Sequence, residues 1–340
     1  MSLSKVSYHG GCKVKKTGVG VNLTKGILVL IFCVVIHACG SEKPRKVEKG
    51  IINSNTTWQK EILIAGDVEI ARGATLTIMP GTIVKFAKIE ADGPANLYDD
   101  KTNYFSRAEL IVKGKLSAKG SKDNKIVFTS AERSPRPGDW GAINFNDSTD
   151  HLLAYCDISY ADTGIHGHGA QVKVGNCYLH HNGVGIALKN LAKLRTQSTM
   201  SLVQNQIIGN GGGILCGAGS RCSISHNQIS NNKLYGIYGK MASSSQVSYN
   251  NIMYNGKGII LYATQGFQLA DNNISDNEEY NVSLLEGQRW NVDARHNWWG
   301  TKDESRIKDL IWDRDKDGTL GKVDFSDLAV SRIQEAGVAG

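Results

Sequence analysis

One hexapeptide frame, Asn-x-Ile-x-x-Asn, recurs at intervals of about 22 residues, as NQIIGN, NQISNN, NNIMYN and NNISDN. Its first position continues the register in both directions and gives the series Cys156, Cys177, Asn205, Asn227, Asn250, Asn272 and Asn297. A second series runs in phase with it and consists of Gly-Ile pairs that begin at Gly164, Gly185, Gly213, Gly236 and Gly258. Two series that share one period rarely arise by chance, and a period of this length is typical of a solenoid.

Each repeat contains short segments in which apolar and polar residues alternate, such as QVSYNNIMYN, separated by Gly and Asn. This pattern predicts strands rather than helices. Each coil would contain three short strands and three turns, and coils stacked about 4.8 Å apart would align the Ile and Val positions into one apolar core. Stacked Asn side chains can pair along the axis and tolerate the left-handed backbone of a sharp bend, so we interpret them as structural.

Upstream segments 76–86, 110–131 and 137–145 also predict strands, broken by Pro-Gly, Lys-Gly and Asp-Trp-Gly turns. Together with HNWWG at 296–300, the repeats resemble bacterial right-handed parallel β-helix proteins of the pectate-lyase-like superfamily. The resemblance covers roughly residues 58–330. It implies an all-β fold, a single-stranded right-handed parallel β-helix of about ten coils. It implies little about activity, because this architecture hosts lyases, hydrolases, adhesins and proteins without catalysis.

We predict four segments along the chain: a signal peptide at 1–38, a tether at 39–57, the β-helix at 58–300 and a C-terminal cap at 301–340. A cap is expected because a solenoid has open ends that must be covered. Ile307, Leu310 and Ile311 lie at helical spacing after Asp303 or Ser305, which predicts a short helix across the last coil.

Two segments interrupt the repeat. The long polar stretch at 89–107 predicts a loop that leaves the second coil, and the wide step between Cys177 and Asn205 predicts an insertion near NLAKLRTQSTM.

The N-terminus predicts export. Its first 38 residues carry five lysines and no acid, and they contain an apolar segment of about eleven residues. A bilayer-spanning helix needs roughly 20 residues, so this segment is typical of a cleaved signal sequence. The end of the segment, IHAC at 36–39, resembles the lipobox of bacterial lipoproteins, which implies acylation at Cys39 and a lipid anchor in a bacterial membrane of the cell envelope. The alternative is an apolar helix that ends beside a chance cysteine.

Charge and motifs exclude several classes of function. Removal of the five N-terminal lysines would lower the formal net charge from +7 to about +2. No run of Lys and Arg with interleaved aromatic residues remains, so we do not expect nucleic-acid binding. The sequence also lacks a Gly-x-Ser-x-Gly elbow, a Walker loop and a His-Glu-x-x-His motif.

Alternation along each strand predicts that the residue after each Gly-Ile pair points outward. The first outward row comprises His166, Ala187, Leu215, Tyr238, Ile260 and Ser283. The second lies two residues later and comprises His168, Lys189, Gly217, Lys240, Tyr262 and Leu285. These rows carry rings and bases, and we predict that an extended saccharide binds at His166, Lys189, Tyr238, Lys240 and Tyr262. The alternative is an ordinary solvated sheet face.

The rows contain no carboxylate, whereas sugar-cleaving β-helices generally need carboxylates to hold calcium or to act as acid and base. We therefore predict a non-catalytic module that binds carbohydrate or another extended partner at the cell envelope. The alternative is a polysaccharide lyase or glycoside hydrolase that uses loop carboxylates, for which the candidates are Asp99, Asp100, Asp139 and Asp147.

Histidine and cysteine offer weaker signals. Five histidines cluster within 31 residues and would favour a metal if they converged, namely His151, His166, His168, His180 and His181. They fall at different corners of the coil, so no single site follows. Cys156 and Cys177 would stack one coil apart as thiols or as a disulfide, and Cys216 and Cys222 could close a small loop in an oxidising compartment.

The segment DRDKDGTLGKVD at 313–324 fits the spacing of a calcium loop. Its ligands would be Asp313, Asp315, Asp317, the Thr319 carbonyl and Asp324, with Gly318 at the bend. Asp replaces the usual Glu at the last position, so an acidic turn that closes the cap is the alternative. Bound calcium would be structural.

Overall fold

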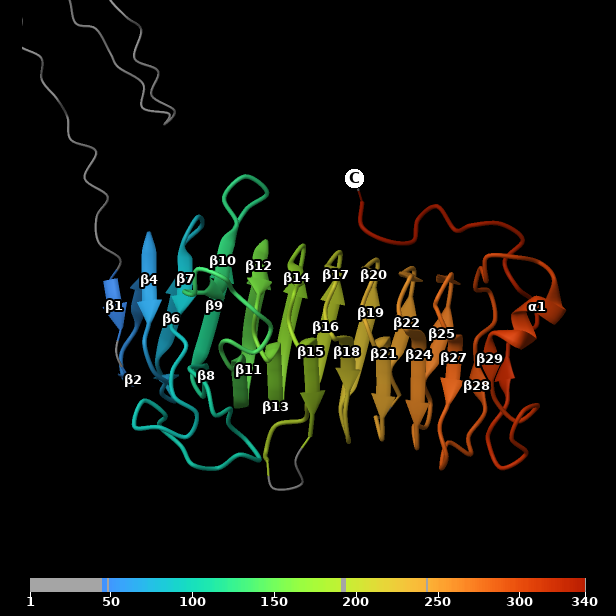
Figure 1. Cartoon of the computed structure of the whole chain (residues 1–340), viewed down its shortest axis with the longest axis horizontal. Helices are drawn as coiled ribbons and strands as arrows, with labels where there is room; N and C mark the ends of the chain where they lie inside the picture. Colours follow the sequence, from blue (N-terminus) through green and yellow to red (C-terminus); the bar gives the residue numbers. More distant parts are fainter. Residues whose placement is uncertain (1–44, 48, 191–193, 243, 340) are drawn as a thin grey trace, which may run out of the picture. The chain divides into compact units, whose positions relative to one another are not determined.

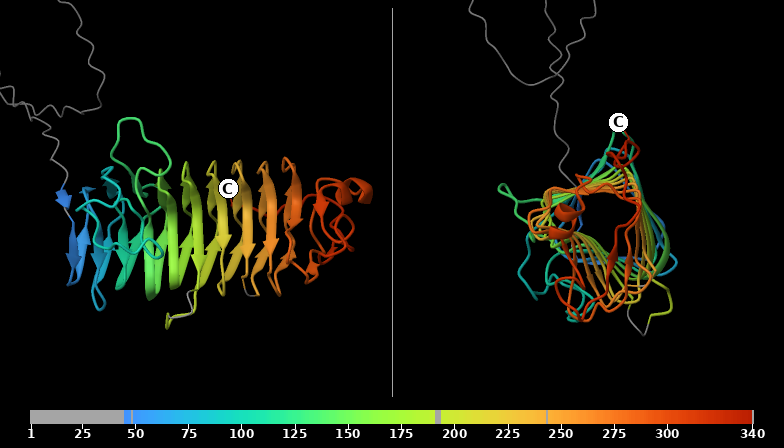
Figure 2. Two further views of the ribbon diagram at one scale, coloured as in Figure 1. Left: turned by 60° about the horizontal axis from the view of Figure 1, so that its bottom comes forward. Right: turned by 90° about the vertical axis from the view of Figure 1, so that its right-hand side faces the viewer.

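The computed structural model describes residues 45–47, 49–190, 194–242 and 244–339. These residues form the predicted parallel β-helix, in which each strand pairs in parallel with the equivalent strand of the next coil. Seen along the axis, the coils lie over one another around a common core (Figure 2). The predicted signal peptide and Cys39 lie outside the described residues.

Three strands per coil build three sheets, and sheet 1 has ten strands in the described residues. Its order is β1 (Arg45–Val47), β4 (Glu61–Ile64), β7 (Ile83–Phe86), β10 (Ile126–Ser130), β12 (Cys156–Ser159), β14 (Tyr178–His180), β17 (Gln206–Ile208), β20 (Gln228–Ser230), β23 (Asn251–Met253) and β26 (Asn273–Ser275). Ten stacked strands agree with the prediction of about ten coils.

Sheet 2 begins after the second corner of each coil. Its order is β2 (Gly50–Ile52), β5 (Val68–Ile70), β8 (Leu110–Val112), β11 (Ile143–Ala154), β13 (Thr163–Gly175), β15 (Val184–Lys189), β18 (Gly212–Cys216), β21 (Tyr235–Lys240), β24 (Lys257–Tyr262), β27 (Tyr280–Leu284) and β29 (Ile311–Trp312).

Sheet 3 closes each coil, and the long strands β11 and β13 continue into it through their second halves. Its other members are β3 (Thr56–Trp58), β6 (Thr75–Ile78), β9 (Lys115–Lys119), β16 (Thr199–Val203), β19 (Arg221–Ser225), β22 (Gln246–Ser248), β25 (Gln268–Ala270), β28 (Val292–Asp293) and β30 (Val323–Asp324).

The repeated frame places an asparagine ladder at each end of the sheet 1 strands β17, β20, β23 and β26. The first ladder is Asn205, Asn227, Asn250, Asn272 and Asn297, and the second is Asn182, Asn210, Asn232, Asn255 and Asn277. In each ladder the amide oxygen of one Asn accepts hydrogen bonds from the backbone N–H and the side-chain amide of the Asn one coil before it. The isoleucine between the ladders, such as Ile252, is completely buried. This arrangement confirms that the asparagines are structural.

The left-handed bend lies one residue before the position that the sequence suggested. The ladder asparagines themselves do not have positive φ, whereas the preceding residues Gln204, His226 and Tyr249 have φ of 61°, 57° and 54°. The bend therefore turns the chain just before the Asn, whose side chain then points inward to the neighbouring coil.

The β-helix begins earlier and ends later than predicted. Residues 45–57 are not a tether, because β1 pairs with β4, β2 with β5 and β3 with β6. At the other end, β29 and β30 lie within the predicted cap, yet they extend sheets 2 and 3. Both segments are short and polar on one side, so their strand character is visible only in the pairing.

The cap contains the predicted helix, α1 (Glu304–Asp309), which begins after Asp303. The Asp303 side chain accepts hydrogen bonds from the backbone N–H groups of Ser305 and Arg306, and Ile307 is buried against the last coil. After β30 the chain runs back over sheet 1, where Asn273 bonds both backbone groups of Ile333 and Asn251 donates to the carbonyl of Ala336. Among the described residues, no helix has the length and apolarity needed to cross a membrane.

Candidate functional site

The first outward row predicted from the sequence is one continuous line on the outer face of sheet 2. Strand pairing places its members opposite one another in successive coils, in the order Glu69, Ile111, Asn144, His166, Ala187, Leu215, Tyr238, Ile260, Ser283 and Trp312. In the second row His168 pairs with Lys189, and Lys240 pairs with Tyr262. We call this surface the sheet 2 face.

The half of the sheet 2 face nearer the C-terminus is open and contains a depression. Three predicted saccharide-binding residues, Tyr238, Lys240 and Tyr262, line this depression of about 590 Å³ together with Glu286 and Arg289. Both tyrosine rings are partly exposed, and burial raises the pKa of the Tyr238 hydroxyl, which keeps it protonated and able to donate a hydrogen bond. Partly exposed rings beside cationic side chains form a surface on which a sugar ring can stack.

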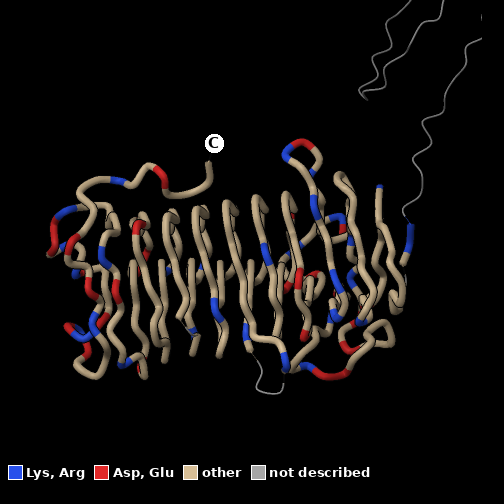
Figure 3. Tube along the Cα trace, turned by 180° about the vertical axis from the view of Figure 1, so that it is seen from behind, with Lys and Arg blue, Asp and Glu red and all other residues tan. Residues whose placement is uncertain are grey.

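The central coils carry an unbroken stretch without acidic residues. Between Asp162 and Asp271 the sequence contains no Asp or Glu, and it contains eight basic residues, namely Lys173, Lys189, Lys193, Arg195, Arg221, Lys233, Lys240 and Lys257. Figure 3 shows the acidic residues gathered toward the two ends of the described β-helix. Of these basic residues, Lys189 and Lys240 lie in the outward rows of the sheet 2 face, where their charges attract anions.

The other half of the sheet 2 face is covered by the predicted loop at 89–107, the teal segment at the lower left of Figure 1. The carboxylate of Asp67 accepts a hydrogen bond from the Leu97 N–H at 2.6 Å, and Glu109 accepts one from the Phe105 N–H at 3.2 Å. Burial raises the pKa of Asp67 to about 6 and the pKa of Glu109 well above its ordinary value. These two buried carboxyl groups hold the base of the loop.

The tip of the loop reaches the predicted site residues. Asn144 donates to the carbonyl of Asn103 at 2.9 Å, and the Lys189 ammonium lies 3.5 Å from the carbonyl of Thr102. The ring of Phe105 meets the ring of His166 edge-on with centroids 5.1 Å apart.

This arrangement corrects the prediction of one open strip. His166 and Lys189 lie beneath the loop, apart from the depression around Tyr238, and the loop's position could not be inferred from the repeat.

Comparison with known families is informative at this point. The model of a family described as "Periplasmic copper-binding protein (NosD)" matches residues 118–295, more than half of the chain. The chain belongs to the NosD family. A second family model, described as "Pectate-lyase like beta helix domain", matches residues 50–149. Together the two matches confirm the predicted pectate-lyase-like β-helix, and no curated protein matches the sequence.

Solved structures similar to this NosD-family chain include two epimerases. The A-module of the mannuronan C-5 epimerase AlgE6 from Azotobacter vinelandii is 16% identical, with 70% of this chain and 77% of that chain covered and a TM-score of 0.42. The periplasmic alginate epimerase AlgG is 11% identical, with 87% and 85% covered and a TM-score of 0.42. At these values the likeness carries no inference about activity.

A second depression of the NosD-family chain lies on sheet 3 and was not predicted from the sequence. It measures about 620 Å³, and the polar side chains along it include Lys173, Arg221, Gln171 and Gln246. These residues come from β13, β19 and β22, at positions that carry no periodic signal of their own. Only the stacking of the coils brings them together.

Three of the four loop carboxylates of the enzymatic alternative are bonded within a local turn or an ion pair. Asp139 is buried and accepts hydrogen bonds from Ser130 Oγ and the Arg136 N–H, both at 2.9 Å. Asp147 pairs with Arg72 at 2.8 Å. Asp100 accepts a bond from the Thr102 N–H within the loop, and Asp99 is exposed beside it. Each bonded carboxylate stabilises a local turn or ion pair.

The five clustered histidines occupy three places. His151 is buried in sheet 3, where its Nδ1 accepts a bond from the Leu116 N–H at 3.2 Å. His166 and His168 lie on the sheet 2 face with ring centroids 4.3 Å apart. His180 and His181 lie in sheet 1 and its corner, where their Nδ1 atoms are 2.6 Å apart and Asp157 bonds His180 Nε2 at 2.9 Å.

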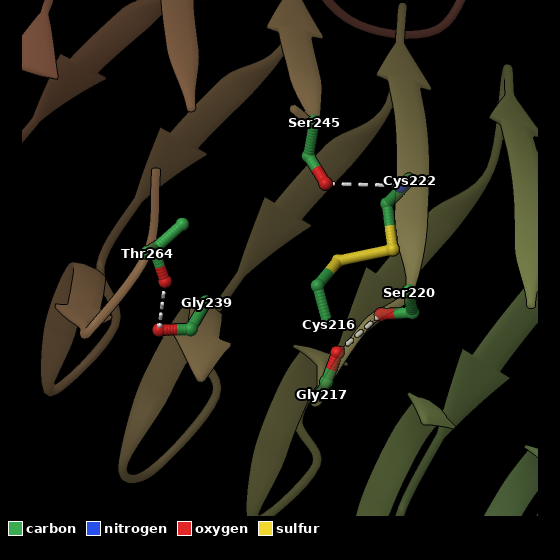
Figure 4. Close-up of a disulfide and its surroundings, with 7 residues drawn as sticks. All are labelled: Cys216, Gly217, Ser220, Cys222, Gly239, Ser245 and Thr264. Carbon is green, nitrogen blue, oxygen red and sulfur yellow. Dashed lines mark hydrogen bonds between the residues drawn. A yellow bond between two sulfur atoms is a disulfide. The ribbon is translucent and has the colours of Figure 1, made fainter. Parts of the chain in front are cut away.

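The four described cysteines differ in state. Cys216 and Cys222 form a disulfide that closes the turn from β18 to β19, and Ser220 Oγ donates to the Gly217 carbonyl at 2.6 Å inside it (Figure 4). Cys156 and Cys177 are free, buried thiols that continue the first asparagine ladder. Burial raises the pKa of the Cys156 thiol, so it is inert as a nucleophile.

The predicted calcium loop connects β29 and β30. Asp313 is buried and its carboxylate accepts bonds from the N–H groups of Asp315 and Val323. The Lys322 ammonium lies 3.3 Å from Asp313 and also pairs with Asp315. The Asp317 carboxylate accepts a hydrogen bond from the Thr319 hydroxyl, and the Asp324 carboxylate accepts one from the Ser326 hydroxyl, so each caps its own turn. In the described part of the chain, no three His, Cys, Asp or Glu side chains are grouped to hold a metal.

Proposed function

We propose that this NosD-family chain is an exported β-helix module that binds an extended anionic polysaccharide along the sheet 2 face. Two features carry the proposal. The sequence contains no Asp or Glu between Asp162 and Asp271, and the depression around Tyr238 and Tyr262 is open and lined by aromatic and basic side chains. Polyanions gain affinity from such a field, and tyrosine rings supply the stacking platform for sugar rings. Lys189 and Lys240 on this face lie two coils apart, about 10 Å at about 4.8 Å per coil, and such a regular spacing suits a polymer with regularly spaced charges.

Copper, which the family description names, does not fit the described side chains. A copper site is built from several imidazole, thiolate or thioether ligands that converge on one point. Among the described residues no such group of three His, Cys, Asp or Glu occurs. Cys216 and Cys222 are oxidised, Cys156 and Cys177 face the core, and the His180 and His181 nitrogens bond each other. We therefore derive no step through copper.

The binding proposal predicts that the double change Tyr238→Ala and Tyr262→Ala weakens the affinity for an acidic polysaccharide about tenfold, because it removes the stacking surface and leaves the core intact. Binding should be measured by calorimetry with a polyuronate, a sulfated glycan, a neutral glucan and a single-stranded DNA oligomer. Tyr254→Ala is the matched control, since Tyr254 is 55% exposed at a corner away from this face.

Unchanged affinity in the double variant would place the site elsewhere, and preferential binding of the DNA oligomer would replace the saccharide by a nucleic acid. Turnover of the bound polysaccharide, seen as new reducing ends or unsaturated uronates, would favour the alternative of a lyase or hydrolase.

We further propose that the protein acts at the cell envelope, tethered through Cys39. The proposal rests on the signal sequence and the lipobox resemblance. The Cys216–Cys222 disulfide supports it, because disulfides persist in oxidising compartments outside the cytoplasm.

A further inference from the structure

One buried histidine on the sheet 2 face has no hydrogen-bond partner. His168 is completely buried, and neither Nδ1 nor Nε2 is within hydrogen-bond distance of a partner. An imidazole that is buried without partners destabilises the folded protein, because it gives up its bonds to water. Folded proteins satisfy nearly all buried polar groups, so such an exception calls for a functional explanation.

Two segments cover His168. The loop at 89–107 approaches from one side, where its Thr102 carbonyl lies near the Lys189 ammonium. Burial lowers the pKa of His168 to about 4 and lowers the pKa of Lys189, and the charge of the Asp100 carboxylate in the loop partly offsets both shifts. The insertion approaches from the other side, where Ser198 Oγ accepts a bond from the Gly169 N–H at 2.8 Å. His168 lies one coil before Lys189 in the second outward row, which continues to Lys240 and Tyr262.

The loop tip resembles an anionic ligand of the sheet 2 face. It carries two carboxylates, Asp99 and Asp100, and its Thr102 carbonyl lies against the Lys189 ammonium of that face. Tyr98 is anchored, since its hydroxyl bonds Glu69 and Lys113 on the sheet. Beyond it, the tip from Asp99 to Asn103 is held to the sheet by the bond from Asn144 to the Asn103 carbonyl and the contact of Lys189 with the Thr102 carbonyl. Loops held by a few exposed bonds open locally at low free energy, whereas the β-helix beneath stays folded.

We propose that His168 belongs to a covered saccharide subsite, and that the acidic segment Asp99–Asn103 is a lid that occupies this subsite until the anionic group of a polysaccharide displaces it. The inference rests on the proposed polysaccharide binding. Lys189 would pair with the carboxylate or sulfate of one sugar unit. The neutral imidazole of His168 has one N–H donor and one acceptor nitrogen, which suits a sugar hydroxyl.

The test replaces the imidazole by an apolar side chain. His168→Leu should raise the melting temperature by a few degrees, because the unsatisfied polar group is gone, and should weaken binding of the acidic polysaccharide about tenfold. His168→Gln keeps a donor and an acceptor and should bind with intermediate affinity. His226→Leu is the matched control, since His226 stacks on Tyr249 at a different corner of the coil.

The lid is tested separately by Asp100→Asn, which preserves the turn and removes one negative charge. It should tighten binding of the acidic polysaccharide about threefold at low salt and leave a neutral glucan unaffected. Both readouts use the intact exported protein.

The outcomes separate the two proposals. If His168→Leu raises the melting temperature without changing affinity, or lowers the melting temperature, the covered subsite is overturned while binding at the tyrosines stands. If no polysaccharide binds the unmodified protein or the Asp100→Asn variant, the proposed function and the subsite both fail. If only the tyrosine variant keeps full affinity while His168→Leu loses it, the subsite stands and the open depression fails.

Discussion

At the residue scale, the stability of this chain depends on one amide repeated at two corners of the coils that contain β17, β20, β23 and β26. Each ladder asparagine is buried and uses both ends of its amide, so a single side chain satisfies backbone groups of the coil before it and of its own coil. The left-handed residue before it accepts varied side chains because these point outward. The ladder positions could therefore be predicted from the repeated Asn, whereas the position of the bend could be found only from the backbone angles.

Asn250→Asp should destabilise the protein by about 3 kcal/mol or more. The Asn250 amide nitrogen donates to the carbonyls of Ile224 and Ser248 and to the side chain of Asn272, and a carboxylate would face all three acceptors without a proton to share. Thermal unfolding followed by circular dichroism measures the change. Asn231→Asp, at an exposed corner position with φ of 56°, should have almost no effect, and equal melting temperatures for the two variants would contradict the ladder.

At the scale of elements, the loops and the cap determine which part of the sheet 2 face is exposed and how the acidic turn is neutralised. The loop at 89–107 divides one continuous face into a covered and an open half, and its attachment depends on two carboxyl groups, Asp67 and Glu109, that lie outside every motif. The turn between β29 and β30 shows the same principle, because Lys322 supplies from within the chain a positive charge that a bound cation would otherwise provide.

We propose that calcium binds at the cap, and substitution of Lys322 provides a direct test of this proposal. Lys322→Ala should increase the rise in melting temperature caused by millimolar calcium, because Asp313 and Asp315 would lose their cationic partner and still repel each other. Asp315→Ala in the same background should abolish that rise. Calorimetric titration and thermal unfolding with and without chelator measure both effects, and the absence of heat and of a thermal shift in every variant would reduce the segment to a turn.

At the scale of the whole molecule, the described residues form a β-helix with charged ends and basic central coils (Figure 3). Few acids face the middle of the chain, so an extended anion would meet no repulsion over several coils. The same composition keeps net charge low after the N-terminal lysines are removed, which limits non-specific attraction by charge alone.

Cys39→Ser should release the protein from membranes into the soluble exported fraction. The serine hydroxyl cannot form the thioether that carries the lipid, and lipid chains supply the free energy of anchoring. Fractionation of cells that express each form, with immunodetection of the protein, measures the shift. A variant of equal length, Cys33→Ser within the apolar segment, serves as the control, and membrane association that survives Cys39→Ser would remove the lipoprotein assignment.

The sequence by itself determined the coil, its period, the inward isoleucines and the outward rows, because each of these is fixed by contacts between equivalent positions that recur in every repeat. Tyr238, Lys240 and Tyr262 were predictable as neighbours for the same reason. The tertiary structure alone decided that His168 is covered, that the sheet 3 depression exists and that Lys322 neutralises the acidic turn. These features depend on where irregular segments fold back onto the helix, and a segment that occurs once leaves no periodic trace from which its packing can be inferred.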